Sequence, residues 1–179
     1  EFEGGAAVDV RELVLLGGGQ GETRQLDQYI RGMSFDGFES TWRYIVYGDG
    51  TLTVRHTVKP QGAMPAWLPR LGVTFGLDGD FNNVEWYGRG PQANYPDRKS
   101  GYRIGIWNTT VEDMYEPYLI PQDYGLRTDN RWVRMTDSEG NGVELSVDEP
   151  FNFNAYNYTT ENLTKAAYTY QLQKSDDIT

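Results

Sequence analysis

The segment STWRYIVYGDGTLTVRHTVKP, residues 40–60, constrains the fold more strongly than any other part of the sequence. Trp42, Tyr44 and Val46 recur at a period of two residues, which is the period of a β-strand and not of a helix. Gly48-Asp49-Gly50 then supplies the residue types of a tight turn, and the alternation resumes after it. The segment therefore predicts an antiparallel hairpin with two long strands.

The same alternation recurs over much of the chain, between turn signals rich in Gly, Asp, Asn and Pro. Many strands separated by turns are typical of packed antiparallel sheets, whereas alternating strands and helices would predict a parallel sheet. The expected fold class is therefore all-β, a sandwich of antiparallel sheets. The further strands are expected over Leu71–Leu77, Val84–Tyr87, Arg103–Trp107, Trp132–Thr136 and Val143–Val147.

One short helix is expected in the C-terminal part of the chain. Thr159 or Thr160 can cap its N-terminus, because a hydroxyl oxygen accepts a hydrogen bond from a free N–H group of the first turn. Leu163, Ala166 and Ala167 would supply its short apolar stripe.

The length of 179 residues suits one large β-domain, and we expect a single domain over residues 1–179. The 21 glycines are spread between the expected strands and are not pooled in a linker. The proline-containing stretch QGAMPAWLP, residues 61–69, is the only plausible boundary between two parts.

The formal net charge of −10, with no dense run of Lys or Arg, argues against nucleic acid and anionic membranes as partners. No apolar run is long enough to cross a bilayer. The start EFEGGAAVDV lacks the basic and apolar regions of a signal peptide, so a cytoplasmic and a periplasmic location both stay open.

The chain has no cysteine and one histidine, which excludes thiolate chemistry and a metal site built from histidines. His56 shares a strand face with Leu52 and Val54, and we expect it to be packed and hydrogen-bonded there. We expect neither a metal nor a cofactor to be bound by this chain.

Two glycine- or aspartate-rich stretches resemble ligand loops but lack required residues. LLGGGQG, residues 15–21, is not followed by a convincing helix, so we expect a surface loop and not a nucleotide site. DGDFNN, residues 78–83, begins like an EF-hand loop, but Asn83 and Arg89 stand where glycine and glutamate are needed. A solvated turn is the better interpretation.

The stretch WYGRGPQANYPDR, residues 86–98, has two interpretations. Its prolines are unsuited to a phosphate loop. In the first interpretation its rings and polar groups contact a carbohydrate. In the second, which we favour, the glycines permit a bend, the prolines stiffen it, and Asp97 pairs with an arginine to fix the loop, so that Asp97→Ala lowers stability sharply. The candidate residues are Trp86, Arg89, Asn94, Tyr95, Asp97 and Arg98.

Several blocks resemble one family in the same order along nearly the whole chain: LPRLGVTFGL, VEWYGRGPQANYPDRKSG, YEPYLIPQDYGLRTDNRWVRMTD and FNFNAYNYTTENLTKAAYTYQL. They are similar to the C-terminal, or small-chain, domain of the lactose-hydrolysing β-galactosidases of glycoside hydrolase family two. The likeness is weakest over residues 1–38. It implies a supersandwich of two large antiparallel sheets like that of galactose mutarotase.

The resemblance also implies that the nucleophile and the acid/base of this retaining glycosidase lie on a separate barrel domain. No catalytic residue is therefore expected in this chain, and the Mg and Na ions of the family would be bound elsewhere. The implied partners are the barrel, in the same polypeptide or a large subunit, a galactoside, and further copies of the enzyme in a homo-oligomer.

Two departures from the family are visible. Histidines expected near Asn157 and Tyr168 are absent, and the family's galactose-stacking tryptophan would lie after the final Thr179. We therefore expect a fragment of a larger enzyme that supports the barrel and the galactose pocket. The alternative is a stand-alone carbohydrate-binding or epimerase-like module, although a single histidine supplies poorly the acid and base that a mutarotase needs.

Overall fold

The computed structural model describes residues 9–12, 35–62, 68 and 70–179, and side chains from residue 37 onward. The chain divides into two compact units, one that contains the hairpin and one that contains Phe75–Thr179. The LLGGGQG stretch and most of residues 61–69 lie outside the described residues.

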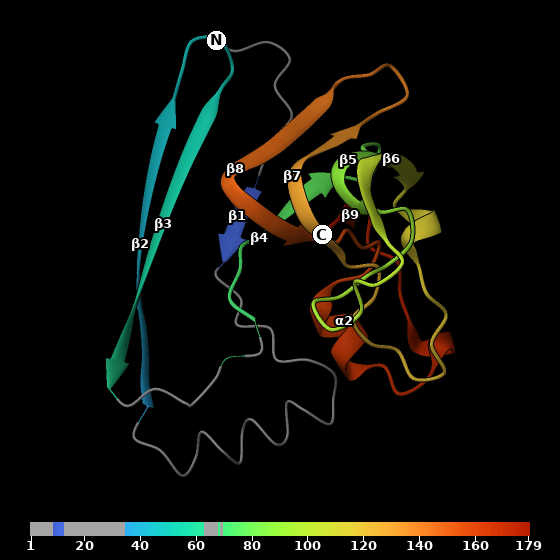
Figure 1. Ribbon diagram of the computed structural model, residues 1–179. Coiled ribbons are helices and arrows are strands. Elements are labelled where there is room, and N and C mark those ends of the chain that lie inside the picture. The colour runs from blue at the N-terminus through green and yellow to red at the C-terminus, as the bar shows by residue number, and fades with distance from the viewer. Residues whose placement is uncertain (1–8, 13–34, 63–67, 69) are drawn as a thin grey trace. The chain divides into compact units, whose positions relative to one another are not determined.

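The first unit is the predicted hairpin, with β2 (Phe35–Val46) paired antiparallel to β3 (Leu52–Gly62) (Figure 1). One face carries the apolar pairs Tyr44–Val54 and Val46–Leu52, while the other carries mainly charged and hydroxyl side chains. Asp49 Oδ1 accepts a 2.9 Å hydrogen bond from Thr51 N and closes the turn. The alternation therefore predicted both strands and the turn correctly.

His56 lies on the apolar face of the hairpin, opposite Trp42 in the register. Its ring stacks on the Trp42 ring with a centroid distance of 3.7 Å and an interplanar angle of 7°. Its Nε2 lies 3.0 Å from Ser40 Oγ. The expected packed and hydrogen-bonded histidine is confirmed.

The second unit contains two sheets. The first has the order β6-β5-β7-β8, and the second has the order β1-β4-β9. The strand pairs β4–β9, β5–β6, β5–β7 and β7–β8 are all antiparallel, so the all-β prediction is confirmed. The bounds are β1 Asp9–Glu12, β4 Thr74–Asp78, β5 Asn83–Gly90, β6 Arg103–Thr110, β7 Arg127–Thr136, β8 Gly142–Phe153 and β9 Asp177–Ile178.

The strands of the second unit differ in extent from the expected ranges. β7 and β8 are longer than expected, because their ends follow register shifts that break the simple alternation. Residues 71–73 are not a strand, so the prediction of one beginning at Leu71 was wrong. Asp78 Oδ1 accepts a 3.0 Å bond from Asp80 N, which gives the DGDFNN stretch the expected turn.

The core of the second unit lies between its two sheets. Val84 and Trp86 of β5 face it from one side, and Leu77 of β4 and Ile178 of β9 face it from the other. All four are at most 3% exposed. Because the two sheets bury apolar faces against each other, this unit is a sandwich.

The predicted helix is α2 (Thr160–Lys165), and Thr159 is its N-cap. Thr159 Oγ1 accepts a 3.1 Å bond from Asn162 N, and Leu163 is buried beneath the helix. Ala167 is exposed beyond the C-cap, so the apolar stripe is one residue shorter than expected. Two 3-10 helices, η1 (Glu112–Met114) and η2 (Thr169–Gln171), were not predicted because three residues carry no periodic signal.

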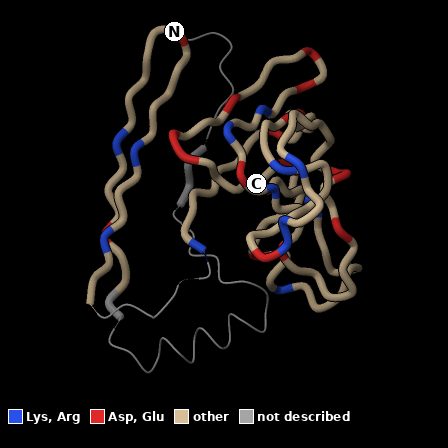
Figure 2. The backbone as a smooth tube through the Cα atoms, viewed as in Figure 1, with Lys and Arg blue, Asp and Glu red and all other residues tan. Residues whose placement is uncertain are grey.

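Charges of both signs are interleaved along the described chain and are not collected on one element (Figure 2). Some exposed ion pairs join neighbours on one element, such as Glu161 with Lys165 on α2, and others join distant segments, such as Glu112 with Lys174. Exposed pairs of this kind contribute little to stability.

Replacing Thr159 by alanine should lower the free energy of unfolding by about 1 kcal/mol, because Asn162 N loses its acceptor. Urea unfolding followed by circular dichroism measures the change. Thr159→Ser keeps the hydroxyl and should restore most of the loss. Equal stability of the alanine variant and the parent would show that the cap does not stabilise this unit.

Candidate functional site

The stretch of residues 86–98 forms the end of β5 and the loop that returns to β6. Its first ring, Trp86, is completely buried, and its Nε1 donates a 3.1 Å hydrogen bond to the Arg89 carbonyl oxygen. The Gly90–Pro91 peptide bond that follows is cis. The Trp86 indole therefore belongs to the core and holds the bend in the chain that follows it.

Asn94 fastens this loop to β7 and is completely buried. Its Nδ2 donates to the carbonyl oxygens of Arg89 (3.1 Å) and Gln92 (3.0 Å). Its Oδ1 accepts from Thr128 N (3.1 Å) and Thr128 Oγ1 (2.5 Å). Since all four hydrogen-bonding positions of this amide are used, no polar group of Asn94 is left for a ligand.

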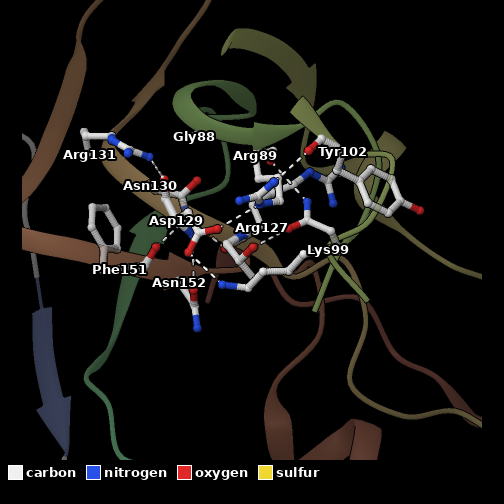
Figure 3. A network of polar contacts seen from close by, with 12 residues as sticks. Gly88, Arg89, Lys99, Tyr102, Arg127, Asp129, Asn130, Arg131, Phe151 and Asn152 are labelled. Carbon is white, nitrogen blue, oxygen red and sulfur yellow. Dashed lines mark hydrogen bonds and ion pairs between the residues drawn. The ribbon is translucent and has the colours of Figure 1, made fainter. Parts of the chain in front are cut away.

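Asp129 of β7 carries the main charged contact of the site (Figure 3). Its two carboxylate oxygens accept 2.8 Å bonds from Arg89 Nε and Lys99 Nζ. Arg89 Nη1 also donates to the Tyr102 carbonyl oxygen at 2.8 Å. The Lys99 hydrogen bond, followed by that of Arg89, lowers the pKa of Asp129 against the opposing effect of partial burial.

The backbone of Asp129 is left-handed, with φ of 56°. Asp and Asn adopt this conformation more readily than other residues with a side chain. The position therefore has two requirements, a negative charge for Arg89 and Lys99 and a backbone that tolerates positive φ.

Gly88 and Asn130 fit against each other beside this contact. Asn130 is completely buried, and its Nδ2 donates at 2.8 Å to the carbonyl oxygens of Arg127 and Phe151. A Cβ on Gly88 would lie 2.0 Å from Asn130 Oδ1 and 2.9 Å from its Cα. Only glycine fits at position 88 without displacing Asn130.

Arg127 lies beneath the same network and is 4% exposed. Its guanidinium carbon lies 5.1 Å from the centre of the Trp86 ring, and its Nη1 donates to the Gly125 carbonyl oxygen at 2.8 Å. Burial lowers the pKa of Arg127 to about 10, although Glu116 partly opposes the change. The buried cation contacts the π-system of Trp86 and strengthens the core there.

A cluster of tyrosines adjoins the loop. Tyr124 and Tyr156 are buried, with ring centres 4.8 Å apart in an edge-on arrangement, and Tyr115 meets Tyr124 at 5.1 Å. The Tyr156 hydroxyl donates to Asp123, and Asn154 Nδ2 donates to the same carboxylate. Rings and hydroxyls thus find their partners inside the unit.

The six candidate residues separate into an inner and an outer group. Trp86 and Asn94 offer nothing to a sugar, and Arg89 is occupied by Asp129 and Tyr102. Tyr95 is half-buried, burial above all raises its pKa to about 12, and the Arg98 guanidinium lies 5.1 Å from its ring centre. Tyr95, Asp97 and Arg98 therefore form the outer group that solvent reaches.

The expected role of Asp97 requires a correction. Its side chain is exposed, and among the described residues it forms no ion pair with an arginine. Asp129, 32 positions further along the chain, holds Arg89 instead. The residues that sequence reasoning missed, Arg127, Asp129 and Asn130, lie in GLRTDNRW, where the only available signal was an Asp-Asn pair that tolerates positive φ.

A shallow pocket on the same sheet is lined mainly by polar groups of β5, β6 and β7, such as Glu85 and Asn108, together with Asp113 of η1. Its lining includes no aromatic ring, and Glu85 is paired with Arg134 at 3.1 Å. It therefore lacks the stacking surface that a sugar site commonly has.

Within the described residues no group of three or more His, Asp and Glu side chains is placed to hold a metal ion. No helix of the described chain is long and apolar enough to cross a membrane.

Comparison with known families assigns most of the chain to one family. Residues 10–179 match the family described as β-galactosidase small chain. The chain belongs to this family. Trp86 and Asn94 lie in the segment VEWYGRGPQANYPDRKSG, and Asp129 lies in YEPYLIPQDYGLRTDNRWVRMTD. The network therefore joins two of the segments that resemble the family.

Individual β-galactosidases are also similar to this small-chain sequence. That of Priestia megaterium is 34% identical over 136 residues, 76% of this chain and 13% of the relative. That of Halalkalibacterium halodurans is 38% identical over 132 residues, 72% of this chain and 13% of the relative. The β-galactosidase of Vibrio cholerae is 34% identical over 135 residues, which are 75% of this chain and 12% of the relative. The small-chain sequence thus spans only 12–13% of the length of these relatives.

Replacing Gly88 by alanine should lower the free energy of unfolding by about 3 kcal/mol, because its Cβ would overlap Asn130. Gly76→Ala is the matched control, since a Cβ at this strand position meets no atom within 4 Å. Calorimetry of both variants gives the comparison. Similar melting temperatures for the two would contradict the close fit of Gly88 and Asn130.

Asp129→Ala should lower stability by about 2 kcal/mol at neutral pH, and Asp129→Asn by less, because asparagine keeps the left-handed backbone and loses only the charge. The pKa of Asp129 is lowered in the folded chain, so its stabilisation is full above the unfolded value near 3.8 and is lost as the pH falls below it.

Urea unfolding at about pH 7 and about pH 3 tests this dependence. The gap between the parent and Asp129→Asn should narrow at the acidic pH. A gap of the same size at both pH values would show that the carboxylate charge does not act in this way. Asp97→Ala, which removes an exposed carboxylate, is the control and should leave stability within about 0.5 kcal/mol.

Proposed function

We propose that this chain is a non-catalytic domain of a glycoside hydrolase family two β-galactosidase that hydrolyses terminal β-D-galactosides such as lactose. The observation that carries the proposal is the family match over residues 10–179, combined with relatives of which the chain spans 12–13%. A chain that matches so small a part of enzymes with this name fits a domain or subunit better than a complete enzyme.

The described residues support an auxiliary role. Asn94 and Asp129 form their hydrogen bonds and ion pairs with other groups of the same chain. A catalytic centre needs acid and base groups that can reach a substrate. The chain would therefore support a separate catalytic barrel and help to complete its galactose pocket, with any metal ions bound by residues outside this chain.

Within residues 86–98, the side chains that would contact a carbohydrate are those of the outer group, Tyr95, Asp97 and Arg98. Tyr95 offers part of a ring, and the two charged side chains are exposed. We also propose that the whole chain completes a galactose mutarotase-like supersandwich and that the parent enzyme is a homo-oligomer.

The proposal is tested by purifying the native protein that contains this chain with an antibody against it. The purified material should contain a polypeptide, or a tightly bound second subunit, several times longer than 179 residues, and it should hydrolyse lactose. The isolated 179-residue chain should neither hydrolyse lactose nor bind galactose with a dissociation constant of about 1 mM or tighter.

Two results would overturn the proposal. One is purified material that contains the chain alone and shows no hydrolysis of lactose or of a chromogenic galactoside. The other is an isolated chain that saturates with galactose or accelerates its mutarotation in a polarimeter, which would identify a stand-alone module. The Asp129→Asn and Asp97→Ala variants of the lactose-hydrolysing protein add a control. A structural role for Asp129 predicts that Asp129→Asn loses activity faster on heating than Asp97→Ala, at an unchanged KM for lactose.

A further inference from the structure

The turn between β7 and β8 contains the only Asn-Gly pair of the sequence, Asn141-Gly142. Both residues are exposed. In such a pair the backbone nitrogen of the glycine can attack the side-chain amide of the asparagine, because glycine has no side chain to hinder the approach. The reaction needs no enzyme, so the way in which the fold holds the two residues decides its rate.

The fold requires glycine at position 142. A Cβ placed there would lie 1.9 Å from the Met135 carbonyl oxygen and 2.8 Å from Thr136 Cα. Both atoms belong to the backbone of β7, which pairs with β8 at this point through Met135–Val143 and Thr136–Gly142. The residue that makes the pair reactive is therefore one that the hairpin needs.

The backbone nitrogen of Gly142 is directed away from β7. Asp137 N donates a 2.9 Å hydrogen bond to the Asn141 carbonyl oxygen, and the peptide bond between Asn141 and Gly142 is trans. In a trans peptide the C=O and the N–H that follows it point in opposite directions, so the Gly142 N–H faces the other side of β8. No described strand pairs with β8 on that side. Solvent therefore reaches this nitrogen and can take its proton.

The side-chain amide of Asn141 is held by Asp137. Asn141 Nδ2 donates to Asp137 Oδ2 at 3.0 Å, and Asn141 N donates to Asp137 Oδ1 at 2.9 Å. The same carboxylate accepts a 2.8 Å bond from Glu139 N, which fixes it within the turn. The hydrogen bond from the Asn141 side chain is the largest cause of the lowered pKa of Asp137. Since one carboxylate binds both the backbone and the side-chain nitrogen of Asn141, the amide is directed back to Asp137 and not toward Gly142.

We infer that Asn141 is a site of spontaneous deamidation and that Asp137 is a positioning residue that slows the reaction. The Gly142 nitrogen loses its proton to solvent and forms a bond to Asn141 Cγ. The Cγ–Nδ2 bond breaks, and the Nδ2 group takes a proton from water and leaves as ammonia. Water then opens the cyclic imide at Cγ, which gives aspartate, or at the main-chain carbonyl carbon, which gives isoaspartate. Water is the only co-reactant.

Either product changes the end of the β7–β8 hairpin. A carboxylate oxygen replaces the Nδ2 group that lies 3.0 Å from Asp137 Oδ2, so a hydrogen bond becomes a contact between two negative charges. Isoaspartate also adds a carbon atom to the main chain directly before Gly142, the first residue of β8. The turn that is disturbed also contacts β5, because Asn83 Nδ2 donates to the Asp137 carbonyl oxygen at 3.0 Å.

The inference is tested by incubating the full chain at neutral pH and following digests over time by mass spectrometry, with fragmentation that separates isoaspartate from aspartate. Asn141 should convert before any other asparagine. Asp137→Ala should convert about 5-fold faster than the parent, the factor that the loss of one ordinary hydrogen bond gives. Asp137→Asn keeps an acceptor oxygen for the amide, and its rate should lie between the two.

Asn83→Ala is the matched control, because it removes another hydrogen bond of the same turn and leaves the Asp137 carboxylate in place. It should convert at the rate of the parent. Circular dichroism verifies that each variant is folded during the incubation. In concentrated urea the parent and Asp137→Ala should convert at the same rate, because the contact between Asp137 and the amide exists only in the folded chain.

Conversion that begins at another asparagine overturns the site, and so does a folded Asp137→Ala chain in which Asn141 stays intact. Equal rates for the folded parent and Asp137→Ala overturn the role of Asp137. A rise of the same size in Asn83→Ala also overturns that role, because it would assign the effect to a general loosening of the turn. Should Asp137→Ala fail to fold, Asp137→Asn decides the point, and a rate equal to that of the parent counts against the carboxylate.

Discussion

The second unit depends on one buried side-chain amide. Asn94 lies in the loop after β5. Its side-chain amide donates to the carbonyl oxygens of Arg89, at the end of β5, and of Gln92, within the loop, and it accepts two hydrogen bonds from Thr128 of β7. A buried amide with all partners present stabilises a single arrangement, whereas one with a missing partner is costly. Around it, the Trp86 indole, the Arg89 ion pair and the Gly88 contact each require the loop to take this path.

The network also shows that an aromatic and charged stretch can serve the packing of a loop. Tryptophan, arginine, aspartate and asparagine are the residue types that recognise sugars, and they are equally the types that tie a loop to a sheet. Burial distinguishes the two uses here. Trp86 and Asn94 are completely buried, whereas Asp97 and Arg98 of the same stretch reach solvent.

The sequence was sufficient for the strands and not for the contacts between them. Alternation is a local property, so the hairpin of β2 and β3 and most strands of the sandwich were predictable, and Thr159 was identifiable as a cap. Asp129 was not, because its partners Arg89 and Lys99 lie 40 and 30 positions away. Assigning the arginine to Asp97, the nearest acid in the stretch, used sequence proximity where the register of β5 and β7 decides the contact.

The left-handed backbone at Asp129 has a consequence for how this domain can diverge. Glycine would satisfy the backbone but lose both ion pairs, and glutamate would keep a charge at the cost of the backbone. Asparagine would satisfy the backbone requirement but not the charge. No single replacement meets both conditions, so an evolutionary path away from aspartate must also change Arg89 or Lys99. Substitution at position 129 is therefore coupled to substitution at Arg89 or Lys99.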